Sequence, residues 1–422
     1  MSFTKTILKN GLRVILVPQP SSLAATVLIL VEAGSEYEAK SVNGVSHFLE
    51  HMTFKGTARR PRPGMIAEEL AGLGAESNAF TSHEYTGYWA KAEREKLPQI
   101  LDIVSDLYLS PLFNPEEIEK ERGVVIEEVN MYEDTPTQRV HSLFMRLLYG
   151  DQPAGWDILG EKRTIRKLGK KDLVAYREKH YIAPKTVVVV AGSLSPKRVM
   201  GQVKEMFGGL KRARTAEKLR TAHSQRKPRA IVKVKESDKS HLVLGVPAFT
   251  VFDKRRYALQ VLSDVLGGGM SSRLFHRLRE ELGAAYYIHA SAEFLIDHGY
   301  LGVGAGVDHK KLEMVLKAIL EELERLRDDL VDAKELQKSK DHLIGGLILS
   351  LETSDELAAF YGGQEVLTRS ILRPPDLIAN IRKVKAEEVR AVARQLLRGH
   401  KLNLAIIGPY KNSSPFQKAL QL

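Results

Sequence analysis

The chain has 422 residues, of which 43% are hydrophobic and 27% charged, and its formal net charge is +11. This length exceeds what one hydrophobic core organises and predicts two or more domains, while the composition is typical of a globular protein. The absence of cysteine excludes disulfides, thiolate metal sites and thiol catalysis. No stretch approaches the roughly twenty apolar residues of a membrane helix, so we expect no membrane partner.

The chain opens with two predicted strands, residues 12–17 and 26–31, which are rich in apolar and β-branched side chains. From the short segment before residue 12, we expect no signal or transit peptide. Together with the missing cysteines, this leads us to expect a cytoplasmic location.

The run His47-Phe48-Leu49-Glu50-His51 follows within a predicted helix. Residues four apart are neighbours on one helix face, so both imidazoles can point at one metal ion. Glu50 lies next to the second histidine, close enough to contact a metal-bound water, which is the arrangement of inverted zinc peptidases. The alternative is an ordinary surface helix that carries two exposed histidines.

A second helix is predicted over residues 115–131, with Asn114 as its N-cap. A catalytic zinc site needs a further protein ligand while one position stays open for water. Glu127 and Glu128 point about 100° apart on this helix, so its geometry allows either one but not both. Glu121 shares the face of Glu128 but lies about 10 Å away along the axis, which leaves it a supporting role.

The remaining pattern suggests two related halves of similar length. Strands are predicted at 186–192 near the end of the first half and at 230–234, 241–245 and 402–408 in the second, with helices at 310–328 and 333–351. Strands at both ends of each half, with helices between, predict a duplicated α+β domain whose sheet is mainly antiparallel. We expect a domain at residues 1–212, a linker at 213–228 and a second domain at 229–422.

Much of the positive charge lies in residues 211–235, where ten Lys and Arg accompany one acidic residue. Nucleic acid could use such a tract, but it has no interleaved aromatic residues and belongs to no known binding module. We interpret it as a solvated basic linker and expect no nucleic-acid partner.

Several motifs together resemble the pitrilysin family of zinc metallopeptidases, and specifically its short branch, which includes the mitochondrial processing peptidase β subunit. Besides the His47–His51 run, they are Asn78-Ala79-Phe80-Thr81, residues 131–136, the Gly267-Gly268-Gly269 segment with residues 270–275, and residues 358–362. The resemblance spans essentially the whole chain. It implies two homologous domains that form half of a clamshell, and it implies zinc-dependent hydrolysis of unfolded peptides within a chamber.

The resemblance also implies roles for individual residues. Glu128 becomes the third ligand of one Zn²⁺ per chain, beside His47 and His51, and Glu121 supports the site. Glu50 would take a proton from water and later pass one to the leaving amine. The segment Asn78, Ala79, Phe80 and Thr81 would bind an extended peptide as an added strand. Arg279 and Tyr286, from the second half, would hold the substrate and assist catalysis, and we expect a homodimer.

Other interpretations remain open at this point. Tyr287 and Arg273 compete with Tyr286 and Arg279 for the substrate roles, whereas we assign His83 to the edge strand and not to the metal. A processing peptidase for one precursor leader is an alternative function. A non-catalytic scaffold, or a partner subunit of a heterodimer with a metal-free chain, is another.

Overall fold

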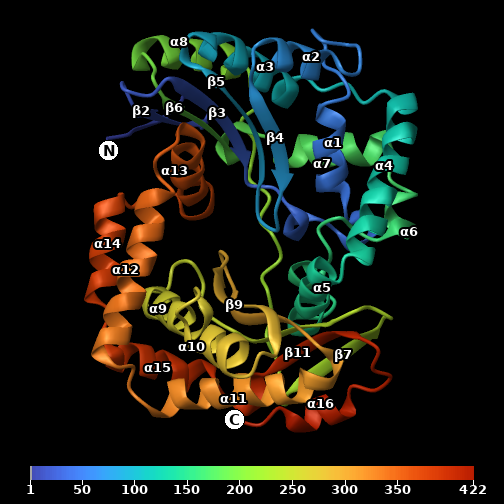
Figure 1. Ribbon diagram of the computed structural model, residues 1–422. Helices are drawn as coiled ribbons and strands as arrows, with labels where there is room; N and C mark the ends of the chain where they lie inside the picture. The colour runs from blue at the N-terminus through green and yellow to red at the C-terminus, as the bar shows by residue number, and fades with distance from the viewer. Residues whose placement is uncertain (1) are drawn as a thin grey trace. The chain divides into compact units, whose positions relative to one another are not determined.

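The computed structural model describes residues 2–422 and divides into two compact units. In the described chain, the first consists of residues 2–130, Trp156–Leu219 and Ile348–Arg373, and the second of Met131–Gly155, Arg220–Leu347 and Pro374–Leu422. Figure 1 labels their helices and strands. Within residues 2–422, none of the helices has the length and apolar character that crossing a membrane requires.

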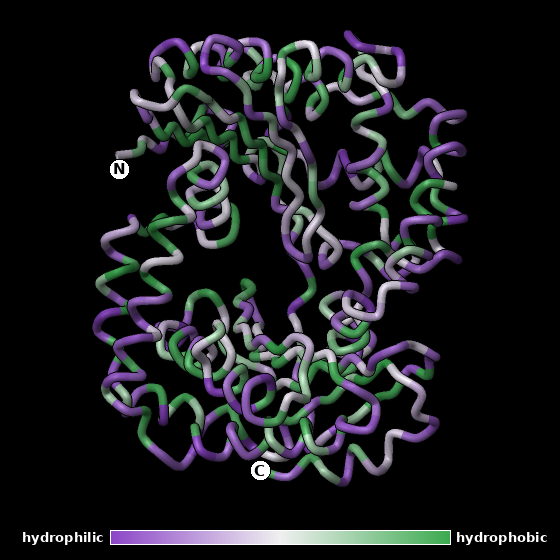
Figure 2. The backbone as a smooth tube through the Cα atoms, viewed as in Figure 1, coloured by the Kyte–Doolittle hydropathy of each residue, from purple (hydrophilic) through white to green (hydrophobic). Residues whose placement is uncertain are grey.

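The first unit is built on a six-stranded sheet in the order β1-β2-β6-β3-β5-β4. The strands are β1 Thr4–Ile7, β2 Arg13–Pro18, β3 Ala24–Val31, β4 Glu76–Thr81, β5 Thr86–Glu93 and β6 Thr186–Gly192. Only β2 and β6 pair in parallel. The strands predicted at 12–17, 26–31 and 186–192 are therefore confirmed, and the central ones are predominantly hydrophobic in Figure 2.

Helices cover both faces of this sheet. Alternate residues such as Val27 and Ile29 share a core with α1 (Val45–Thr53), α3 (Leu97–Leu109), α7 (Lys170–His180) and α8 (Pro196–Phe207). The intervening residues point to the opposite face. There α13 (Ser354–Thr368) packs so closely that a Cβ added at Gly362 would lie 2.8 Å from Leu30 Cδ1. The first half of the chain also contains α2 (Met65–Gly72), α4 (Pro115–Asp134) and α6 (Lys162–Ile165).

The second unit contains a five-stranded sheet in the order β7-β11-β8-β10-β9. Its strands are β7 Arg229–Val234, β8 Ser240–Pro247, β9 Ala285–Phe294, β10 Gly299–Val307 and β11 Asn403–Gly408. One face packs in a large apolar core against helices that include α9 (Arg256–Gly267), α11 (Leu312–Asp328) and α15 (Ala386–Leu396). The other face receives α5 (Pro136–Tyr149), whose Val140 and Phe144 pack against Val243 and Ile407. The unit also contains α10 (Arg273–Phe275), α14 (Pro374–Lys383) and α16 (Ser414–Ala419), and α12 (Ala333–Leu349) follows α11.

The two sheets share one topology. Apart from the additional edge strand β1, the strands correspond: β2 and β7 lie parallel to the last strand, β6 or β11. The last strand pairs antiparallel with β3 or β8, and a hairpin, β4–β5 or β9–β10, completes the sheet. This repetition confirms the predicted α+β fold with two related, mainly antiparallel domains. The division at residues 212 and 229 stays a prediction, because each compact unit also includes one helix, α5 or α13, from the other half of the chain.

The connection between α8 and β7 contains no helix or strand among the described residues. It is not fully solvated, however. The side chain of Lys218 is buried, its Nζ lies 2.9 Å from Glu84 Oε1, and it also pairs with buried Glu36. This part of the basic tract is therefore anchored to the first unit by two ion pairs.

Candidate metal centre

Helix α1 carries the two histidines, and its start is set by a glycine. Gly44 has φ of +96°, and a Cβ at this position would lie 2.6 Å from Ile165 Cδ1 and 2.7 Å from Leu159 O. Only glycine combines this backbone conformation with so close an approach. Phe48 and Leu49 are fully buried in the core of the first unit. The position and rotation of α1 are thereby fixed, with His47 and His51 on a different face.

The structure brings three potential metal ligands together. His47 Nε2 lies 3.2 Å from His51 Nε2, and Glu128 Oε2 lies 3.2 Å from His51 Nε2 and 3.5 Å from His47 Nε2. A tetrahedral zinc ion with bonds of about 2.0–2.2 Å would separate its ligand atoms by about 3.3–3.6 Å. The donor types and their spacing therefore fit zinc.

The burial and protonation of the two histidines are consistent with a metal site. His47 is 6% exposed, and its Nδ1 has no hydrogen-bond partner among the described residues. Burial, with repulsion from His51, lowers the pKa of His47 to about 4, so this imidazole is neutral, as a ligand must be. Burial alone would lower the pKa of His51, but hydrogen bonds with Glu121 and Glu128 raise it to about 9. A metal ion at this point would take the place of that proton.

The geometry distinguishes the glutamates of α4. Glu127 is exposed, and its Oε2 accepts a hydrogen bond from Asn130 Nδ2 at 3.1 Å, away from the histidines. Glu128 faces them, and its hydrogen bond with His51 lowers its pKa. The predicted start of this helix is also confirmed, since Asn114 Oδ1 accepts the Glu116 N–H at 2.9 Å.

Glu121 lies beside the cluster. Its Oε1 is 2.8 Å from His51 Nδ1, and its Oε2 is 2.5 Å from Lys55 Nζ. A carboxylate on the second nitrogen of a metal-binding histidine fixes the tautomer and the orientation of the ring. Burial opposes the charge of Glu121, but the bonds with His51 and Lys55 lower its pKa overall.

Glu50 is directed towards the edge strand β4. Its Oε2 accepts a hydrogen bond of 2.5 Å from Thr81 Oγ1. Burial raises the pKa of Glu50, and the bond from Thr81 opposes that rise. A carboxylate of raised basicity beside a metal cluster suits the role of a general base.

Strand β4 pairs only with β5, so its other edge is free of strand partners in the described chain. Asn78 Oδ1 accepts the N–H of Ala79 at 2.9 Å, which shows that this N–H points away from β5. Phe80 is 38% exposed and lies over Gly87. The predicted binding segment is thus an accessible sheet edge that ends at the contact between Thr81 and Glu50.

Arg279 and Tyr286 belong to the second unit, where each lies at an irregularity of the backbone. Arg279 is in a π-helical turn, His276–Glu281, and its Nη1 donates to the carbonyl of Tyr286 at 2.9 Å. Tyr286 is the residue inserted at a β-bulge between β9 and β10, since Ala285 pairs with Val307 and Tyr287 with Gly306. Tyr286 is 54% exposed. π-turns and bulges occur often at functional sites, where they redirect a side chain.

The competing residues are engaged elsewhere. The Tyr287 hydroxyl lies 2.9 Å from His241 Nδ1, and burial raises the pKa of Tyr287 to about 12. Arg273 binds Glu335 through Nε and Nη2 at 2.9 and 2.7 Å. His83 Nδ1 lies 3.3 Å from Ser35 Oγ and is not part of the metal cluster. These contacts favour Arg279 and Tyr286 as the pair available to a substrate.

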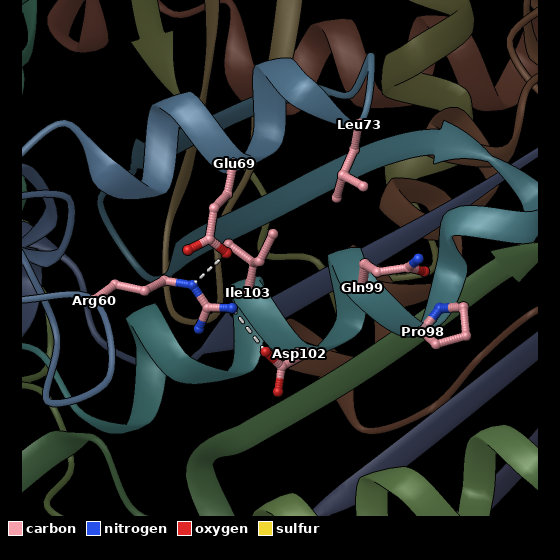
Figure 3. A pocket seen from close by; sticks show the side chains of 7 residues that line it. All are labelled: Arg60, Glu69, Leu73, Pro98, Gln99, Asp102 and Ile103. Carbon is pink, nitrogen blue, oxygen red and sulfur yellow. Dashed lines mark hydrogen bonds and ion pairs between the residues drawn. The ribbon is translucent and has the colours of Figure 1, made fainter.

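Sequence reasoning missed two buried charged groups, one that holds the start of α1 and one that ties the loop after α1 to α2 and α3. One is Glu38, whose carboxylate accepts hydrogen bonds at the start of the helix. The other is Arg60, in the loop after α1, which binds Glu69 at 2.8 Å, Asp102 at 2.8 Å and Asp106 at 2.7 Å. Figure 3 shows Arg60 at a cavity of about 350 Å³ between α2 and α3, and no metal-cluster residue lines this cavity. The sequence shows that a Glu and an Arg occur at these positions, but it does not predict which residues they bind.

Comparisons with known proteins identify the family of this chain. Residues 13–162 match the family described as insulinase (peptidase family M16), and residues 167–343 match the peptidase M16 inactive domain. The chain is 34% identical to an uncharacterized zinc protease of Streptomyces coelicolor, over 97% of this chain and 90% of the relative. It is 35% identical to an uncharacterized zinc protease of Bacillus subtilis, over 96% and 98% of the two chains.

Solved structures show the same fold. A protease from Helicobacter pylori superimposes with a TM-score of 0.91 at 25% identity, covering 97% of this chain and 99% of that one. A peptidase M16 inactive domain from Pseudomonas fluorescens gives a TM-score of 0.89 at 18% identity, with the same coverage. The chain belongs to peptidase family M16, the insulinase and pitrilysin family. Its relatives are named zinc proteases, which supports zinc as the metal of the cluster.

Proposed function

We propose that this protein is a zinc-dependent endopeptidase that hydrolyses unfolded peptides. The observation that carries the proposal is the cluster of His47, His51 and Glu128, whose ligand atoms lie 3.2–3.5 Å apart with Glu50 beside them. We propose that these three residues hold one zinc ion per chain. When bound, zinc supplies Lewis-acid chemistry: it lowers the pKa of a water molecule towards about 7 and polarises the scissile carbonyl.

In this mechanism Glu50 is the general base. Its carboxylate accepts a proton from the attacking water and afterwards delivers a proton to the leaving amine. Thr81 keeps this carboxylate in place through the hydrogen bond at 2.5 Å. Glu121 and Lys55 orient His51, and they do not touch the substrate in this proposal.

The substrate is proposed to be an extended peptide that pairs with the free edge of β4. Backbone groups supply most of the hydrogen bonds in such strand addition, so many sequences are accepted. The Ala79 N–H, which Asn78 Oδ1 holds in the free protein, would be offered to the peptide once the Asn78 side chain turns away. Arg279 and Tyr286 are proposed to donate hydrogen bonds to the substrate, and exposure of the Tyr286 phenol supports this.

Further parts of the proposal concern the assembly and location. We propose an enclosed chamber, a homodimer, no nucleic-acid or membrane partner, and a cytoplasmic location. The sequence interpretation and the family support these statements. The principal alternative within the same chemistry is a processing peptidase that cuts one precursor leader. A non-catalytic scaffold is disfavoured by the compact ligand cluster.

The test compares native protein with Glu50→Gln and, as a matched control, Glu127→Gln, on a mixed set of quenched fluorescent peptides. Glu50→Gln should abolish hydrolysis without loss of zinc. Glu127→Gln should leave the rate unchanged, because that side chain is exposed and faces away from the cluster. Equal rates for native protein and Glu50→Gln would refute the role of Glu50. Native protein that carries zinc but cuts no peptide of the set would contradict broad specificity and favour the processing peptidase.

A further inference from the structure

The start of helix α1 depends on a carboxylate that lies outside the helix. Glu38 is 3% exposed, and each of its oxygens accepts hydrogen bonds from this region. Oε2 accepts from Gly44 N at 2.7 Å and from Asn43 Nδ2 at 2.9 Å. Oε1 accepts from Ser46 N at 2.8 Å and from the Ser46 hydroxyl. Four donors therefore converge on one buried side chain.

This arrangement replaces an ordinary N-cap. The N-cap residue, Gly44, has no side chain, and α1 has no acidic residue in its first turn. The first N–H groups of a helix lack partners within the helix, and burying them unpaired is costly. Glu38 satisfies two of them from a segment six residues before the N-cap. Burial raises the pKa of Glu38 to about 7, and in its charged form the carboxylate complements the positive end of the helix dipole.

The position of the cap makes it relevant to the metal. Ser46, which makes two of the four bonds, directly precedes His47. To share one zinc ion, the Nε2 atoms of His47 and His51, which lie 3.2 Å apart, must both stay within reach of Glu128 on another helix. A shift or fraying of the first turn of α1 would move His47 relative to Glu128. In its charged form, Glu38 would also offset the repulsion between the N-terminus of α1 and a bound cation.

We propose that Glu38 is a positioning residue of the metal centre, which holds the first turn of α1 so that His47 is placed for zinc. The inference rests on the proposed zinc role of His47, His51 and Glu128. Glu38 touches neither metal nor substrate and acts through Ser46 and the backbone of α1.

An amide cannot replace this carboxylate. All four partners of Glu38 donate, whereas a glutamine offers one accepting oxygen and a donating NH₂ group. In Glu38→Gln the NH₂ group would face two donors, so about half of the cap would be lost. Asp172 provides a matched control, because its Oδ2 caps α7 by accepting the Gly169 N–H at 2.9 Å, and α7 carries no metal ligand.

The experiment measures the zinc dissociation constant by competition with a chromophoric chelator, together with the thermal midpoint of the metal-free protein. Glu38→Gln should weaken zinc binding about tenfold, at the lower end of the range for groups that support metal ligands. Ser46→Ala, which removes one of the four bonds and is milder for folding, should weaken it less but measurably. Asp172→Asn should lower the thermal midpoint without a change in zinc affinity.

A second readout separates positioning from general stability. Peptide hydrolysis by Glu38→Gln or Ser46→Ala should recover as the zinc concentration is raised, since the defect is in metal occupancy. Native zinc affinity in both variants, or equal weakening in Asp172→Asn, would overturn the inference while leaving the peptidase proposal intact. Native protein that binds zinc but cuts none of the peptides would contradict the broad-specificity endopeptidase instead and leave the affinity comparison valid.

Discussion

The hydrogen bond from Thr81 to Glu50 gives a quantitative prediction. Thr81→Val removes the hydroxyl but keeps a β-branched side chain suited to strand β4. The bond of 2.5 Å stabilises the charged form of Glu50, against burial, which raises its pKa. A hydrogen bond to a charged group contributes about 1.5–3 kcal/mol. Because 1.4 kcal/mol corresponds to about tenfold in an equilibrium constant, the proton affinity of Glu50 should rise about tenfold to a hundredfold.

The sign follows from the role of the base. Glu50 must be ionised to accept a proton. A higher proton affinity therefore lowers activity at acidic pH and moves the acidic limb of the pH profile to higher pH. The assay is kcat/KM against pH at saturating zinc. Thr4→Val, the same replacement at an exposed position of β1, is the control and should not move the profile. The reasoning would be refuted if the Thr81→Val profile superimposes on the native one, or if its acidic limb moves to lower pH.

Three further predictions follow from the same geometry. Glu121→Gln should weaken zinc binding about tenfold to a hundredfold in chelator competition, because His51 loses its charged partner; an affinity within twofold of the native value would contradict this. Tyr286→Phe should lower kcat/KM while zinc affinity stays unchanged. The decrease should be larger than in Tyr287→Phe, because the Tyr287 hydroxyl already contacts His241. A larger decrease in Tyr287→Phe would assign the substrate role to Tyr287 instead. His180 is buried without a hydrogen-bond partner among the described residues, and burial lowers its pKa to about 3. Since the unfolded chain takes up this proton below about pH 6.5, stability is lost as pH falls from there towards 3. In metal-free protein, His180→Phe should reduce the drop in thermal midpoint between pH 7 and 5, and an unchanged drop would argue against a neutral buried histidine.

Local patterns were sufficient for much of the fold. Residues 186–192 form a nearly continuous β-branched run, and residues 12–17 are apolar apart from Arg13; short runs of this kind are typical of buried strands. The parallel pairing of these two strands depends on the tertiary structure, and the periodicity of the sequence does not predict it. The exchange of α5 and α13 between the halves was not visible either, because an amphipathic helix does not specify which sheet it covers.

The metal centre could likewise be predicted from the sequence only in part. His47 and His51 are one helical turn apart, so their convergence follows from the sequence. Helix geometry left Glu127 and Glu128 open, and only the family resemblance favoured Glu128; the packing of α4 decides the rotation that turns Glu128 towards the histidines. The cap from Glu38 could not be foreseen, because its partners are brought to it by a turn with a left-handed glycine.

The central claim is that His47, His51 and Glu128 together hold one zinc ion. Its most direct test is the zinc content per chain of purified protein, measured for the native chain, Glu50→Gln, Glu127→Gln and Glu128→Gln. The account predicts about one zinc in the first three and a large loss in Glu128→Gln alone, since Glu128 Oε2 lies within 3.5 Å of both histidine nitrogens. Full zinc content in Glu128→Gln, or none in the native protein, would contradict the account.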